Sequence, residues 1–443
     1  MSASSRALRR RLLRGGALVP AAVLAAVIGV PAATAAPAAG LAPHVAMDSA
    51  LRPMTVAGID DSLPENPDLL RQLMWVRAGK VPAVRPGDLR VATYSAGLTR
   101  SAPGMLADEL SAPGSAQAQR VAETVQRAAP DVVLLTDFDV AGGDEAAHSF
   151  RTNYLAVGTG GQQGIDYPYV YTSEVNNGVD TGADLDDDGV IGGAGDSFGP
   201  GDFAGQHGMV LFSRHPIDAD GIRTFRELRW DSMPGNSIPE KAYTDLERSV
   251  LRLSSTAHWD IPVRVEDRTV HVLAAQTADP SARTSSAERH QDELRFWADY
   301  VSGEAEYVTD DDGRSGGLEG DSDFVIVGDY GPHAADDLGT DHSSGIAALL
   351  SDEAVQDPEP ESAGARAAGP GHASATRVVH DDDGVRLERS DYVLPSPGLP
   401  STASGVFWPA DGQLGSHLTR PAGAAGTGPA AERRLVWTDL DLD

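Results

Sequence analysis

Short apolar runs bounded by turn residues recur from residue 89 to the C-terminus and predict β-strands. They are found at 89–94, 131–138, 208–213, 250–255, 261–265, 269–276, 323–330, 389–395 and 433–440. Between these runs, residues 116–129 and 286–301 carry apolar side chains at helical spacing, and residues 344–352 suit a short helix. Strands that alternate with helices along the chain indicate an α/β fold.

The N-terminal region has the pattern of an export signal. Five arginines within residues 6–14 precede an apolar run over 17–30 and the small residues Ala33, Thr34 and Ala35, which is the arrangement of a cleavable signal peptide. The apolar run is shorter than the roughly 20 residues that cross a bilayer, so we expect a secreted protein without a membrane anchor. The adjacent arginines leave both the Sec route and the twin-arginine route open.

These patterns divide the chain into three parts. We expect a signal peptide over 1–35, an extended N-terminal arm over 36–88, and one folded domain over 89–443. Within that domain, acidic or Gly/Pro/Ala-rich stretches predict loops at 307–323, 352–375 and 418–432.

Composition limits the chemistry and the partners of this acidic protein. With 41% hydrophobic residues and no cysteine, the chain can build a large core but forms no disulfide. Its formal net charge is −30, and lysine occurs only at positions 80 and 241. Such a charge repels phosphate backbones, so we expect no strong binding of nucleic acid without added cations. The natural ligand and the oligomeric state are not indicated.

Several longer segments, taken in order, carry a resemblance to a known family. They include 89–100 (LRVATYSAGLTR), 121–139 (VAETVQRAAPDVVLLTDFD), 203–217 (FAGQHGMVLFSRHPI), 391–396 (DYVLPS) and 404–409 (SGVFWP). From Leu89 onwards the chain resembles the secreted actinobacterial branch of the endonuclease/exonuclease/phosphatase superfamily. The resemblance implies a four-layer α/β sandwich, with two central mixed β-sheets flanked by helices. It also implies hydrolysis of phosphomonoesters or phosphodiesters by a divalent metal and a His–Asp pair.

The resemblance places the family's metal and phosphate ligands at strand ends of this sequence. Its phosphate-binding Asn falls on Ser95, and its metal-binding Glu falls on Asp137. Its phosphate-stabilising His falls on Gln276, and its Asp-x-Asn pair falls on Asp329 and Gly331. The implied cation is Mg²⁺ or Mn²⁺, with Asp137 and Asp329 as a remnant site, because a carboxylate one methylene shorter can still reach a metal.

The family's proton-transfer residues differ most in this chain. Asp391 retains the family's Asp, but the terminal Asp-His pair falls on Glu432 and Arg433. Arginine has a pKa above about 12 and cannot accept a proton, and Gln276 cannot deliver one. These substitutions predict a catalytically impaired or inactive relative, a pseudoenzyme, whose partner is a phosphorylated small molecule or a phosphodiester.

A second interpretation stays open, in which the chain is an active but divergent metal-dependent phosphoesterase. Asp137, Asp329 and Asp391 would then hold the metal, and an unrecognised base would prepare the attacking water, with His333 and His342 as candidates. The same pattern would arise if the alignment with the family were displaced by one or two residues. Turnover of a phosphodiester with magnesium, manganese or calcium distinguishes the two interpretations.

An acidic segment at residues 182–193 resembles the first half of a calcium loop. Asp184, Asp186 and Asp188 alternate before a glycine, as oxygen ligands do at positions 1, 3 and 5 of such loops. The usual glutamate at position 12 is replaced by Gly195. The segment predicts a Ca²⁺ site, and a solvated acidic turn is the alternative.

Some conspicuous side chains are interpreted as structural. Trp259, Phe296 and Trp297 lie at strand or helix spacing and predict core packing. His207 precedes a predicted strand and is interpreted as a turn residue.

Overall fold

The computed structural model describes residues 80–280, 285–303, 305–331, 344–369, 371–381, 384–420 and 432–443. The expected signal peptide, nearly all of the expected arm, and the segment with His333 and His342 lie outside these residues. The boundaries at residues 35 and 88 therefore remain predictions. In the described part of the chain, none of the helices combines the length and the apolar character that crossing a bilayer needs.

Six strands form a mixed sheet in the order β12-β13-β1-β2-β4-β3. At its centre β1 (Asp88–Leu98) and β2 (Val132–Phe138) are parallel, and α3 (Ala116–Ala128) connects them. The remaining strands run antiparallel to their neighbours: β3 (Tyr169–Tyr171), β4 (Gly208–Ser213), β12 (Ser401–Val406) and β13 (Val436–Asp441). The apolar runs at both ends of the predicted domain thus lie side by side in one sheet.

Five strands form a second mixed sheet in the order β11-β8-β7-β6-β5. Its parallel pair is β7 (Arg268–Gln276) and β8 (Phe324–Asp329), connected through α6 (Ser286–Ser302). The antiparallel strands are β5 (Arg223–Thr224), β6 (Ala257–Val265) and β11 (Asp391–Pro395). Successive side chains of β8 face opposite sides, so Val325 joins the core shared with the first sheet, whereas Ile326 joins the core beneath α6.

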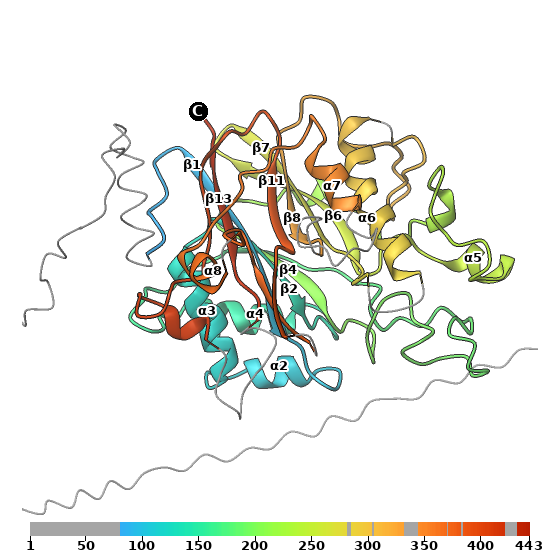
Figure 1. Ribbon diagram of the computed structural model, residues 1–443, viewed down its shortest axis with the longest axis horizontal. Coiled ribbons are helices and arrows are strands. Elements are labelled where there is room, and N and C mark those ends of the chain that lie inside the picture. The colour runs from blue at the N-terminus through green and yellow to red at the C-terminus, as the bar shows by residue number, and fades with distance from the viewer. Residues whose placement is uncertain are drawn as a thin grey trace, which may run out of the picture. The chain divides into compact units, whose positions relative to one another are not determined.

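The two sheets pack face to face, and helices cover their outer sides (Figure 1). Apolar side chains of β1, β2 and β13 form one cluster with those of β6, β7 and β8. The first sheet is covered by α3, by α2 (Met105–Leu110) and by α4 (Glu145–Phe150), and the second by α6 and α7 (Ser344–Leu350). The chain is therefore a four-layer α/β sandwich with two central mixed sheets, as the resemblance implies.

The strand predicted at 250–255 is wrong. Helix α5 (Asp245–Val250) ends there, and the residues after it are irregular, with an isolated bridge at Arg252. Thr244 and Glu247 form a capping box that begins this helix. The apolar alternation of the residues that follow favours a strand and is a stronger signal than this helix cap.

Sequence patterns also miss a hairpin and a short helix. Strands β9 (Arg377–Asp381) and β10 (Gly384–Glu388) form a separate antiparallel pair, and α8 (Ala363–Ala368) lies within a stretch predicted as loop. Charged residues interrupt the alternation of the hairpin, so it lacks a clear period of two. Short helical turns complete the structure at Arg151–Leu155, Ala219–Gly221, Trp230–Ser232 and Ser416–Leu418.

A buried ion pair holds β13 beside β1. Arg90 donates from Nε to Asp439 Oδ1 at 2.6 Å and from Nη2 to Oδ2 at 2.7 Å, and its guanidinium lies over the ring of Trp437. Both partners are almost fully buried, so loss of either would leave an unpaired charge in the core. The pair stabilises the register in which the segment before β13, with Arg433, reaches the end of the sandwich.

Candidate active site

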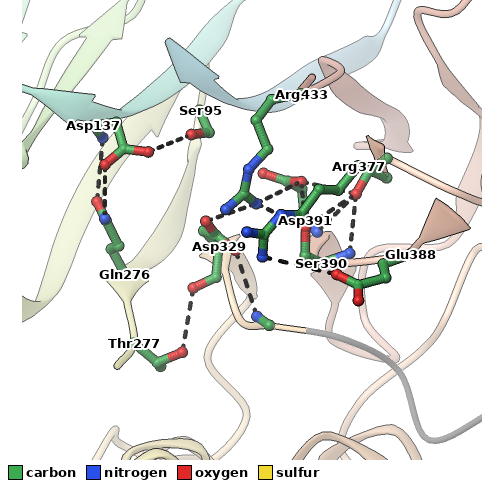
Figure 2. Close-up of polar contacts among 12 residues, drawn as sticks. Ser95, Asp137, Gln276, Thr277, Asp329, Arg377, Glu388, Ser390, Asp391 and Arg433 are labelled. Atoms are coloured by element: carbon green, nitrogen blue, oxygen red, sulfur yellow. Dashed lines mark hydrogen bonds and ion pairs between the residues drawn. The ribbon is translucent and has the colours of Figure 1, made fainter. Parts of the chain in front are cut away.

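Most polar residues predicted from the family resemblance gather at one end of the sandwich. Ser95 lies on β1, and Asp137 lies near the end of the neighbouring β2. In the second sheet Gln276 pairs with Asp329, which pairs with Asp391. The C-terminal ends of parallel strands and the N-terminal end of an antiparallel neighbour lie at the same edge, so these side chains converge (Figure 2).

Asp137 is held by hydrogen bonds from both sheets. Ser95 Oγ donates to Asp137 Oδ2 at 2.7 Å, and Gln276 Nε2 donates to Asp137 Oδ1 at 3.2 Å. The backbone N–H of Asp137 donates in turn to Gln276 Oε1 at 3.2 Å. Asp137 has a φ of 51°, a left-handed conformation in which Asp is enriched over most other residues. Two substituted family positions thus bind the carboxylate that the resemblance assigns to a metal.

His207, interpreted from the sequence as a turn residue, also contacts this carboxylate. Its Nδ1 lies 3.1 Å from Asp137 Oδ1, and its backbone N–H donates to Asp139 Oδ1 at 3.1 Å. The hydrogen bond with Asp137 raises the pKa of the imidazole. Burial opposes ionisation of Asp137, but the hydrogen bond from His207 and the charge of Arg433 hold its pKa well below its ordinary value.

Arg433 extends between the carboxylates of the second sheet (Figure 2). Its Nη1 lies 2.8 Å from Asp329 Oδ2 and 3.6 Å from Asp391 Oδ2. The same nitrogen donates to Ser390 Oγ at 2.8 Å. Burial acts to lower the pKa of the guanidinium, but the charges of Asp329 and Asp391 raise it above its ordinary value. The group is therefore a permanent cation among the carboxylates.

Asp391 is fully buried and accepts hydrogen bonds from hydroxyl groups. Thr376 Oγ1 donates to Asp391 Oδ2 at 2.8 Å, and Ser390 Oγ donates to the same oxygen at 3.0 Å. Among the described residues, Asp391 Oδ1 has no hydrogen-bond partner. Burial and the charge of Asp329 raise the pKa of Asp391 to about 7, although the charge of Arg433 lowers it.

Two predicted positions do not join this group. Glu432 is exposed, and its carbonyl oxygen accepts a bond from Val378 N at 2.8 Å. Gly331 has a φ of +70°, and a Cβ there would lie 2.9 Å from Cε1 of His290. An asparagine at this position would have to displace that imidazole. The structure therefore brings together Ser95, Asp137, Gln276, Asp329, Asp391 and Arg433, but not Glu432 or a side chain at 331.

A cavity of about 190 Å³ opens at this end of the sandwich. Its lining includes Asp137, His207, Gln276, Asp329, Arg377 and Arg433. A divalent cation such as Mg²⁺ or Ca²⁺ needs several oxygen ligands around it. Here the guanidinium of Arg433 already lies between Asp329 and Asp391, so the residues in this arrangement do not fit a divalent metal.

The acidic segment forms a turn in which three carboxylates face one another. Oxygens of Asp184, Asp186 and Asp188 lie within 4.8 Å of one another. Asp184 Oδ1 accepts a bond from Asp188 N at 3.1 Å. The turn is closed by the buried Asp196, whose Oδ1 accepts a bond from Leu185 N at 2.6 Å. Asp196, which lies one residue beyond position 12 of the predicted calcium loop, therefore has a structural role.

The aromatic residues predicted as core are buried. Trp259, Phe296 and Trp297 are each 0% exposed, and His258 packs against Phe296 and Trp297. Burial lowers the pKa of His258 to about 3, so its imidazole is neutral at physiological pH. The prediction that these rings are packing residues is confirmed.

The sequence matches the model of the Endonuclease/Exonuclease/phosphatase family over residues 108–416. Because this match spans well over half of the chain, the chain belongs to that family. Proteins of the family generally depend on divalent metal ions. A comparison with curated proteins finds no match.

Solved structures similar to the chain have low sequence identity to it. An endonuclease/exonuclease/phosphatase from Beutenbergia cavernae is 18% identical, with a TM-score of 0.45, over 80% of this chain and 72% of that one. A mannosyl-6-phosphatase from Bacteroides thetaiotaomicron is 11% identical, with a TM-score of 0.41, over 80% and 99%. A beta toxin structure from Staphylococcus aureus is 12% identical, with a TM-score of 0.39, over 79% and 99%. At these values the likeness gives no argument about substrate.

Proposed function

We propose that the chain is a secreted, catalytically impaired member of its family that keeps the cavity as a binding site. The observation that carries the proposal is the guanidinium of Arg433, 2.8 Å from Asp329 Oδ2 and 3.6 Å from Asp391 Oδ2. It belongs to the segment where the resemblance places the family's terminal His. Arginine cannot accept a proton at physiological pH, so this position provides no general base.

The other substituted positions support the same conclusion. Ser95 and Gln276 direct their polar groups at Asp137, and neither an alcohol nor an amide ionises near neutral pH, so neither acts as a general acid or base. Gly331 carries no side chain that could orient a phosphate. The substituted side chains Ser95, Gln276 and Arg433 can therefore bind and orient a ligand, but they cannot act as a general acid or base.

The proposed ligand is a phosphorylated small molecule or a phosphodiester. Arg377 and Arg433 line the cavity, and planar guanidinium groups match the geometry of phosphate oxygens. Asp137 and Asp329 line it too, so they oppose an anion and limit its affinity. The net charge of −30 opposes nucleic acid over longer distances.

The direct test is turnover of bis(p-nitrophenyl) phosphate and p-nitrophenyl phosphate by the native chain. With Mg²⁺, Mn²⁺ or Ca²⁺ added, we expect nitrophenol release at the rate of the protein-free control, while circular dichroism shows a folded protein. A metal-dependent kcat in the ordinary enzymatic range, about 1–10³ s⁻¹, would exclude the proposal.

A second candidate function is phosphoester hydrolysis with His207 as the base. It is favoured by the 3.1 Å contact between His207 Nδ1 and Asp137 Oδ1, because a carboxylate that orients an imidazole is the arrangement of a general-base pair. His207 also lines the cavity. Under this function, His207→Ala would lower a measurable native rate by about 10²–10⁴-fold. Under the first proposal, neither protein shows turnover.

For the acidic loop we propose Ca²⁺ as the ligand of Asp184, Asp186 and Asp188. Millimolar Ca²⁺ is then expected to raise the melting temperature, because a ligand that binds only the folded state stabilises it, by about 2.7 kcal/mol at a hundred times Kd. The exposed Asp186 offers a control: Asp186→Asn should remove the calcium-dependent shift and leave the chelator-treated protein nearly unchanged. Identical melting curves of the native chain with calcium and with chelator would identify a solvated turn.

Export of the chain is proposed from its N-terminal pattern alone. We expect the mature protein to begin near Ala36, because small residues end the apolar run at Ala33 to Ala35. Intact-mass analysis of protein recovered outside the cell checks this expectation. A secreted product that still carries Met1 would contradict it.

A further inference from the structure

Three carboxylates converge at the site, and the guanidinium of Arg433 stands among them. Asp329 and Asp391 are 8% and 0% exposed, and Nη1 of Arg433 lies 2.8 Å and 3.6 Å from their Oδ2 atoms. The charge of Arg433 also acts on Asp137, whose pKa it helps to lower. Buried carboxylates this close to one another repel strongly, so a cation beside them stabilises their ionised forms.

The guanidinium is anchored as a permanent part of the site. Ser390 Oγ accepts a hydrogen bond from Nη1 at 2.8 Å, and the backbones of Arg433 and Arg377 form a β-bridge. Arginine keeps its charge at every physiological pH. A divalent ion entering here would therefore meet a fixed positive charge and would have to displace it from Asp329 and Asp391.

We infer that the guanidinium of Arg433 takes the place of a divalent cation between Asp329 and Asp391, and that removing it uncovers a latent divalent-metal site there. This inference deepens the proposed function and rests on it for the position of the site. A second observation indicates spare ligand capacity: among the described residues, the fully buried Asp391 Oδ1 has no hydrogen-bond partner. From the described residues, Asp329 Oδ1 accepts only one long hydrogen bond, from Gly331 N at 3.4 Å.

The test is Mn²⁺ binding by calorimetry and by the electron paramagnetic resonance signal of free Mn²⁺. All proteins carry Asp184→Asn, Asp186→Asn and Asp188→Asn, so that the acidic loop does not contribute; this triple variant is the parent. Arg433→Ala is compared with the parent, with Arg433→Lys, which keeps a positive charge, and with Arg377→Ala. Arg377 lines the same cavity, and its guanidinium pairs instead with Glu388 at 3.8 Å.

We expect Arg433→Ala to bind one equivalent of Mn²⁺ at least about tenfold more tightly than the other three proteins. A further Asp329→Asn change should abolish that binding. A folded Arg433→Ala that binds no better than the parent would overturn the inference. So would a parent that already binds one equivalent of Mn²⁺ in a way that Asp329→Asn abolishes.

Loss of the guanidinium can prevent folding, so Arg433→Met, which keeps much of the side-chain volume, is prepared alongside. If neither variant folds, the parent alone decides: Mn²⁺ binding that depends on Asp329 overturns the inference, and its absence supports it. The proposed function fails separately. If the native chain hydrolyses a phosphoester but binds no metal at this site, only the proposed function is overturned. If the native chain binds Mn²⁺ at this site but shows no turnover, only this inference is overturned.

Discussion

Restoring the family's side chains at five positions is expected to give metal-dependent phosphoesterase activity. The variant combines Ser95→Asn, Asp137→Glu, Gln276→His, Glu432→Asp and Arg433→His. Four of these positions, Ser95, Asp137, Gln276 and Arg433, already converge (Figure 2), so the missing elements are side chains and not the fold. A positioned general base contributes about 10²–10⁴-fold in rate, and we expect a gain of at least that order over the native chain with Mn²⁺.

The matched control is the same variant with Arg433 retained. It should stay inactive, because groups that act as a unit are not additive and the guanidinium still occupies the carboxylates. Gly331→Asn is left out, since a Cβ there would lie 2.9 Å from Cε1 of His290. If both variants fold and neither hydrolyses the diester with metal, the assignment of these positions to the family's site is wrong.

Arg433→Ala is expected to destabilise the native chain by about 3–5 kcal/mol, because removing one partner of a buried ion pair leaves an uncompensated charge. The loss should depend on pH. The pKa of Asp391 is raised to about 7 in the folded protein. The contribution of Asp391 to stability is therefore fully present below its pKa in the unfolded chain and is lost as the pH rises through 7. Without Arg433 its pKa rises further, so the loss is expected to be larger at pH 8 than at pH 5.

Urea denaturation at pH 5 and pH 8 measures both quantities. Arg377→Ala is the control, because Arg377 is more exposed and lies 3.8 Å from the carboxylate of Glu388, which Arg386 still pairs with at 2.7 Å. Ion pairs of that kind contribute up to about 1 kcal/mol. Equal losses for the two variants, or a loss for Arg433→Ala that is larger at pH 5, would show that the guanidinium does not neutralise the buried carboxylates.

The layers of the fold could be predicted because buried strands leave a simple signal. The run at 323–330 is apolar on both faces of β8, where Val325 and Ile326 enter different cores. Such a continuous apolar run predicts a buried strand without knowledge of the strands that pair with it. Helix α5 shows the limit. Its capping box at Thr244 and Glu247 is a weaker signal than the apolar residues that follow, and the prediction followed the stronger signal.

Most of the site could be predicted because its residues lie at or near the ends of apolar strands. Asp137, Asp329 and Asp391 are such residues, and strand order brings them together. Thr376 lies just before β9 and His207 lies in a turn, and neither segment has a distinct sequence pattern. Their roles depend on tertiary packing, because a hydroxyl or an imidazole in a loop looks the same in sequence whether or not a carboxylate lies beside it.

A crystal structure of the native chain soaked with Mn²⁺ and phosphate, with anomalous data collected for manganese, shows directly whether Arg433 or a metal ion lies beside Asp329. We expect the guanidinium of Arg433 to stay within hydrogen-bonding distance of Asp329, with no anomalous peak between Asp329 and Asp391. A manganese peak coordinated by Asp137 and Asp329, with the guanidinium displaced, would contradict it.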